Sequence, residues 1–116
     1  MRFFLTSMTF PAIRRSMFFA AALVTLSTAP RTFAQASPVG AREGRHTHPG
    51  LLLIHVEEGT LTLDYEGKPS TDYKPGDSVF VEPGKVHEGI NKGNTPVKAI
   101  ATFVIPTGAT ITTQVK

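Results

Sequence analysis

The sequence predicts a small all-β protein, an antiparallel barrel or sandwich, and three observations support this prediction. After residue 36 the chain falls into short runs rich in β-branched, aromatic and leucine side chains. Turn sequences containing glycine or proline separate these runs. No window of ten or more residues in this part has a helical period of apolar side chains. The chain has 116 residues, of which 41% are hydrophobic and 18% charged, and this suits one globular domain.

The expected strands follow one another at short intervals. Residues 60–65 alternate between polar and apolar side chains, which is the period of a half-buried strand. The expected strands cover residues 51–57, 60–65, 71–74, 78–81, 97–105 and 110–115. A domain of roughly 80 residues has a small core, so we expect it to gain buried area by forming a homodimer.

The positive charge of the chain is confined to its N-terminal part. Arg2, Arg14, Arg15 and Arg31 precede residue 37, whereas no acidic residue does. Residues 37–116 carry eight Lys and Arg against nine Asp and Glu, so the net charge of +3 does not belong to the domain. A basic groove is therefore not expected, and nucleic acid is excluded as a partner.

Residues 1–36 are predicted to be an export signal that is cleaved, which leaves residues 37–116 as the mature domain. Arg14 and Arg15 precede an apolar run over residues 17–26. Small residues allow a peptidase to cut after Ala34 or Ala36. The apolar run is shorter than the ~20 residues of a membrane span. We therefore expect a periplasmic or secreted protein without membrane association in its mature form.

Three alternatives for this segment stay open. The arginine pair resembles a twin-arginine signal, but it suits an ordinary secretory signal equally well. The segment could also be an uncleaved anchor, or an upstream extension of a chain that starts at Met8. Finally, residues 31–35 alternate weakly and could form the first strand of the domain.

Several classes of chemistry are excluded by what the sequence lacks. There is no cysteine, so disulfides, thiolate metal sites and cysteine nucleophiles are excluded. The sequence contains neither of the glycine-rich phosphate-binding motifs, and no G-x-S-x-G motif of a serine hydrolase.

The histidines carry the strongest functional signal. The four histidines all follow residue 36, at positions His46, His48, His55 and His87. On a strand, residues two apart face the same side, so His46 and His48 can bind one metal ion together. The turn over residues 83–86 can bring His87 to the same ion.

Two motifs around these histidines resemble those of the cupins, which are small β-barrels with an internal metal site. The first cupin motif, G-x5-H-x-H-x3,4-E-x6-G, matches from Gly40 to Gly59 in every spacing. The second, G-x5-P-x-G-x2-H-x3-N, matches from Gly76 to Asn91 in every spacing. The resemblance covers residues 38–106. It implies a double-stranded β-helix, or jelly-roll barrel, of the small single-domain type with quercetin-dioxygenase-like motifs.

The resemblance implies a metal site of His46, His48 and His87, and two substitutions qualify it. Leu52 stands where the first motif has glutamate, and Glu82 stands where the second has proline. Without the glutamate, three neutral imidazoles would hold a divalent transition metal such as Fe, Ni, Cu, Zn or Mn. The ion would keep its full charge and favour a small anionic substrate or ligand. The alternative is a degenerate barrel without metal.

Residues near the histidines have expected roles that follow from strand alternation. The expected lining of the pocket consists of Leu52, Ile54, Val79 and Val81. His55 should face away from the metal, as a packing or interface residue. Glu82 could replace the missing ligand, orient a histidine or act catalytically as a proton shuttle, and it could equally face solvent.

Two functions remain open at this stage. The first is an exported metalloenzyme, with dioxygenase-like chemistry as the expected reaction, or isomerase or lyase chemistry if Glu82 moves a proton. The second is a non-enzymatic cupin that binds or senses a small ligand, with or without metal. The fold alone does not decide between them.

Overall fold

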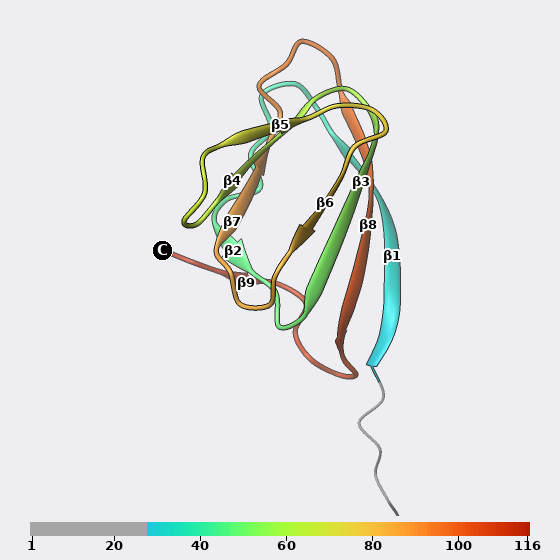
Figure 1. Ribbon diagram of the computed structural model, residues 1–116, viewed down its shortest axis with the longest axis vertical. Helices are drawn as coiled ribbons and strands as arrows, with labels where there is room; N and C mark the ends of the chain where they lie inside the picture. Colours follow the sequence, from blue (N-terminus) through green and yellow to red (C-terminus); the bar gives the residue numbers. More distant parts are fainter. Residues whose placement is uncertain (1–27) are drawn as a thin grey trace, which may run out of the picture.

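Two antiparallel β-sheets face each other and enclose the interior of the molecule (Figure 1). The structure is a computed structural model, and it describes residues 28–116. The first sheet has the strand order β1 (Thr28–Ser37), β8 (Val97–Pro106), β3 (Leu51–Glu58) and β6 (Ser78–Val81). The second has the order β5 (Thr71–Tyr73), β4 (Leu61–Tyr65), β7 (His87–Ile90), β2 (His46–Thr47) and β9 (Thr113–Gln114).

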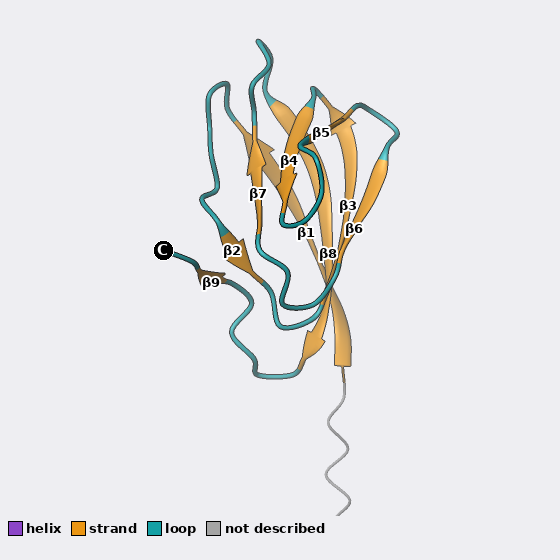
Figure 2. Cartoon of the chain, turned by 60° about the vertical axis from the view of Figure 1, so that its left-hand side comes forward, coloured by secondary structure: helices purple, strands orange, loops and turns teal. Residues whose placement is uncertain are grey.

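The described part of the chain consists of strands and loops only (Figure 2). Every strand pair is antiparallel, and all pairs except β4 with β5 join strands that are not consecutive in the sequence. This confirms the predicted all-β jelly-roll barrel. Within residues 28–116, no helix is long and apolar enough to cross a membrane.

Strand alternation in β3 and β8 builds the core between the sheets. In β3, Leu52, Ile54 and Val56 are buried while the residues between them are only half-buried. In β8 the burial pattern alternates in the same way from Val97 to Ile105. Fully burying one such side chain stabilises the fold by about 1.5–3 kcal/mol. The apolar period of these two strands therefore fixes which face of the first sheet points inward.

Gly59 makes the tight connection between β3 and β4 possible. Its φ is +74°, in the left-handed region that favours glycine. A Cβ atom there would also collide with the carbonyl oxygen of Pro96. Both constraints explain the glycine that closes the first cupin-like motif.

Asn91, the last residue of the second motif, has a structural role. Its side chain is 1% exposed. The amide nitrogen donates to the carbonyl oxygens of Ser37 at 3.0 Å and Thr95 at 2.9 Å. The amide oxygen accepts from the Gly93 nitrogen at 3.0 Å. Asn91 thus joins the end of β1 to the turn between β7 and β8.

Most of the expected strands agree with the structure to within one or two residues. The exception is the last, expected over residues 110–115, of which only Thr113–Gln114 pairs, with β2. This segment is mostly exposed and contributes little apolar surface, so little holds it in a longer ladder.

β1 occupies the region where the cleavage sites were expected. All ten of its residues are in register with β8, from Thr28 opposite Pro106 to Ser37 opposite Val97. Residues 31–35 therefore lie within a strand of the barrel, as the open alternative allowed. The arginine pair and the apolar run lie outside the described residues. The expected cleavage after Ala34 or Ala36 would fall within this strand.

Candidate metal centre

Three of the four histidines converge at one end of the barrel interior. His46 lies in β2, His48 follows that strand directly, and His87 begins β7. His46 and His87 are opposite each other in the β2–β7 ladder. The three ring centroids lie 4.4–4.9 Å apart. One ring nitrogen from each falls in a group whose members all lie within 4.8 Å of one another.

Backbone carbonyl groups fix the orientation of all three imidazoles. The Nδ1 atoms lie 2.6 Å, 2.7 Å and 3.0 Å from the carbonyl oxygens of Gly44, Ile111 and Lys85, in the order His46, His48 and His87. A carbonyl oxygen only accepts, so each Nδ1 carries the proton and donates it. Each Nε2 then keeps a free lone pair. Such hydrogen bonds from the outer ring nitrogen are the usual support for a metal-binding histidine.

Burial favours the neutral form of two of these rings, those of His48 and His87. All three are buried, with exposed fractions of 2–5%. Burial lowers the pKa of His87 to about 4, and the hydrogen bond to Lys85 opposes this shift only in part. Burial also lowers the pKa of His48. Neutral imidazole is the form that binds a metal ion.

The donor set fits a divalent transition metal. Among the described residues, the Nε2 atom of His87 is the one buried side-chain polar atom without a hydrogen-bond partner. An orphaned buried acceptor of this kind is costly, and it calls for a bound group. Three imidazole nitrogens suit Fe, Ni, Cu and Zn better than Mg or Ca.

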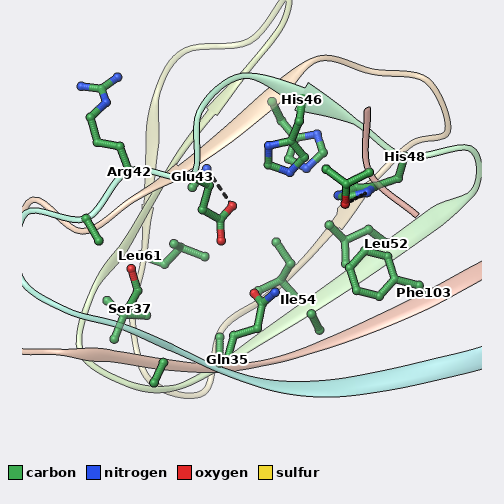
Figure 3. A pocket seen from close by; sticks show the side chains of 18 of the residues that line it. Gln35, Ser37, Arg42, Glu43, His46, His48, Leu52, Ile54, Leu61 and Phe103 are labelled. Carbon is green, nitrogen blue, oxygen red and sulfur yellow. Dashed lines mark hydrogen bonds between the residues drawn. The ribbon is translucent and has the colours of Figure 1, made fainter. Parts of the chain in front are cut away.

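A cavity of about 490 Å³ opens beside the histidines (Figure 3). Leu52 and Ile54 line it, and Phe103 packs edge-on against His48 at 4.9 Å between ring centroids. Leu52 occupies the position of the family's glutamate ligand, so this wall of the cavity is apolar. The remaining apolar wall is formed by Leu61, Val97, Ala99 and Ala101.

The structure places Val79, Val81 and Glu82 away from this cavity. Val81 is buried in the core, Val79 packs against that core, and neither lines the cavity. They share the inward face of Leu52 and Ile54, but they lie on β6, at the far edge of the first sheet. Glu82 is exposed in the turn after β6 and does not line the cavity either. The structure therefore gives Glu82 no place in the site.

His55 and Glu88 both lie on outer faces. His55 is half-buried on β3 and its Nδ1 lies 2.8 Å from the Ser78 hydroxyl, on the side opposite Leu52 and Ile54. Glu88 is buried under Arg42, which donates to both carboxylate oxygens at 2.9 Å. This bidentate bond lowers the pKa of Glu88.

Glu43 is a cavity residue that the sequence did not reveal. Its side chain points into the cavity, whereas that of Arg42 points away (Figure 3). Glu43 is an exposed residue, but the protein around its carboxylate desolvates it in part, and this raises its pKa. Strand alternation misses it because Gly44, at φ +77°, interrupts the extended chain between Glu43 and His46.

Part of this chain is similar in sequence to a plant protein. The chain is 35% identical to Germin-like protein 1 of Brassica napus over 63 residues, which are 50% of this chain and 30% of that protein. The chain thus spans less than a third of the length of this relative.

Solved structures of other proteins share the fold of this chain. A double-stranded β-helix protein of Klebsiella pneumoniae is 19% identical, with a TM-score of 0.64 over 78% of this chain and 81% of that one. A protein of Thermotoga maritima described as a predicted oxalate decarboxylase is 28% identical, with a TM-score of 0.58 over 64% of each chain. The family model of the cupin domain matches residues 34–103, which is more than half of the chain. The chain belongs to the cupin family.

Proposed function

We propose that this protein binds a divalent transition metal through the Nε2 atoms of His46, His48 and His87. We further propose that its cavity receives a small anionic molecule. The observation that carries the proposal is the arrangement of three buried imidazoles, each held by a backbone carbonyl, with one nitrogen of each ring close to those of the other two. Metal identity follows from availability as much as from ligand type, so Fe, Ni, Cu, Zn and Mn are all candidates.

The absence of an anionic ligand sets the class of molecule that the site would bind. Leu52 brings no charge to the cavity wall, so the histidines alone would leave the positive charge of the ion uncompensated. A carboxylate or another oxygen anion would compensate it. The Thermotoga neighbour described as a predicted oxalate decarboxylase is named for such an anion, which supports the same class.

The proposed activity is a dioxygenase-like oxidation of this anion. A bound metal would supply Lewis acidity and, if redox-active, electrons. The chain's own residues position the molecule and shield it, because the walls formed by Leu52, Ile54 and Phe103 exclude water from one side of the cavity. The alternative is a cupin that binds or senses the same anion without turnover.

The place of action proposed for the protein is outside the cytoplasm. The arginine pair and the apolar run before residue 28 suit export to the periplasm or the medium. In this location the protein would load its metal either before or after transport, depending on the route.

The test is oxygen consumption by the iron-loaded protein in the presence of anionic carbonyl and thiol compounds. The proposal predicts uptake of O₂ that is lost in His46→Ala and retained in Glu82→Gln, since Glu82 does not line the cavity. Binding of a compound without O₂ uptake would favour the non-enzymatic alternative. If none of the compounds binds, the proposed ligand class is wrong.

A further inference from the structure

Glu43 sits in the same half of the barrel as the histidines but outside their cluster. The three-histidine group, whose ligand atoms lie within 4.8 Å of one another, does not include its carboxylate. The Glu43 backbone nitrogen donates to the carbonyl oxygen of Gly89 at 3.1 Å. The Gly89 nitrogen in turn donates to Oε2 of Glu43 at 3.3 Å. These contacts fix Glu43 beside β7 and leave its Oε1 atom to the cavity.

The glycine at position 89 provides the room for this carboxylate. Gly89 is two residues from His87 on β7, so both face the cavity, with Cα atoms about 7 Å apart. A Cβ atom on Gly89 would lie 2.7 Å from Oε2 and 2.9 Å from Cδ of Glu43. Any side chain at position 89 would therefore displace the carboxylate. The Glu43 carboxylate consequently lies against β7 at Gly89, two residues after His87.

β1 contributes polar groups to the same end of the cavity. Gln35 and Ser37 are two apart on this strand, and both line the cavity together with Glu43. Figure 3 shows the Gln35 side chain directed into the cavity, toward the side where Glu43 lies. The apolar side chains of Ile54 and Leu61 lie near this polar group. The cavity thus has a second polar group beside the histidines, formed by Glu43, Gln35 and Ser37, and apolar side chains line the cavity next to it.

We propose that Glu43, assisted by Gln35 and Ser37, forms a second subsite that accepts a hydrogen bond from a hydroxyl or amine group on the far end of the ligand. The near end of this ligand is the anion at the histidines, and only that part of the inference rests on the proposed function. A carboxylate oxygen accepts hydrogen bonds and repels a second anion. The cavity should therefore select small hydroxy or amino carboxylates over dicarboxylates of the same length.

Three four-carbon acids test this selectivity because they differ only at the far end. The acids are 4-aminobutyrate, 4-hydroxybutyrate and succinate, titrated calorimetrically at neutral pH into the zinc-loaded protein. Zinc supports binding without redox turnover, so the readout is affinity alone. We expect 4-aminobutyrate to bind about tenfold more tightly than succinate, with 4-hydroxybutyrate between them.

Two variants separate the subsite from the rest of the cavity. Glu43→Gln keeps the shape and removes the charge, and it should reduce the preference for 4-aminobutyrate over succinate to about threefold or less. Gly89→Ala displaces the carboxylate and should have the same effect. Glu82→Gln is the matched control, since this exposed glutamate does not line the cavity and should leave the preference unchanged.

The outcomes are distinguishable from those of the proposed function. Succinate binding as tightly as 4-aminobutyrate, an unchanged preference in both cavity variants, or no binding of any of the three acids would overturn the subsite. If zinc does not bind, the proposed function fails. The same preference, measured by NMR titration of the zinc-free protein, then decides the subsite, because the hydrogen bonds that hold Glu43 involve none of the three histidines.

Discussion

Leu52 is the residue at which this chain departs most clearly from the cupin motif, which has glutamate there. Replacing Leu52 with glutamate tests whether the side chain at position 52 faces the metal. Leu52 lines the cavity with the three histidines. Leu52→Glu should tighten zinc binding by about tenfold or more, because it adds an anionic ligand. Leu52→Gln has a similar size without the charge and should show no such gain. Unchanged or weaker affinity in Leu52→Glu would mean that position 52 does not face the metal.

His87 makes the metal-free protein sensitive to acid. Burial lowers its pKa from the ordinary value of 6.5 to about 4 in the folded protein, so the folded state binds fewer protons than the unfolded state between these two pH values. The contribution of the neutral His87 ring to the free energy of unfolding is therefore complete above about pH 6.5. It is lost as the pH falls toward about 4. The loss should approach about 3 kcal/mol.

Denaturant unfolding of zinc-free wild type and His87→Gln measures this contribution. The difference between their free energies of unfolding should shrink as the pH falls from neutral toward about 4, since other acid-sensitive groups are common to both. A pH-independent difference would show that burial does not shift the His87 titration.

The sequence predicted which histidines converge because their spacing follows the local geometry of strands and turns. His46 and His48 follow the alternation of an extended chain, and the motif spacing brings in His87. The same alternation does not reveal Glu43, because Gly44 turns the chain there. It places Val79 and Val81 correctly on the inward face, but neither of them lines the cavity. The sequence left the position of Glu82 open because a turn residue has no fixed face, and the structure exposes it in the turn after β6. The direction of a side chain is set by its own strand and can be predicted from the local sequence. Whether that side chain lines the cavity depends on how the two sheets pack, which the local sequence does not show.

At the scale of the element, β1 raises the question of where the exported chain begins. Cleavage after Ala34 or Ala36 would remove most of a strand that pairs along its whole length with β8, and cleavage after Ala36 would also remove Gln35 from the cavity. An unpaired β8 would also become an open sheet edge. We therefore predict that processing leaves β1 in place, with an N-terminus at or before residue 28.

The intact mass of the exported protein checks this prediction. A mass corresponding to a first residue near 28 agrees with it, and retention of the whole segment would indicate an uncleaved anchor. A mature chain that starts at residue 35 or 37 would contradict the inclusion of β1 in the mature barrel.

At the scale of the whole molecule, the outer face of the first sheet offers a surface for a homodimer. Phe80 is 60% exposed and lies opposite Leu53, while Val104 is 38% exposed and lies opposite Leu51. These side chains form an apolar outer face on adjacent strands, and such faces commonly mark interfaces. We predict a dimer in solution.

Light scattering coupled to size-exclusion chromatography tests the dimer. Phe80→Lys should shift the protein toward the monomer, because it places a charge within the proposed interface. Lys74→Glu is a control charge change outside this sheet. A monomeric wild type at micromolar concentration would contradict the prediction.

The most direct test of the whole account is the metal content of the untagged protein, purified without chelator and measured by mass spectrometry. The His46→Ala variant, purified in parallel, is the control. The account predicts about one transition-metal ion per chain in the wild type and a large loss in the variant. A wild-type protein that contains no metal, and stays without it after anaerobic reconstitution with Fe²⁺, Zn²⁺ or Ni²⁺, would contradict the account.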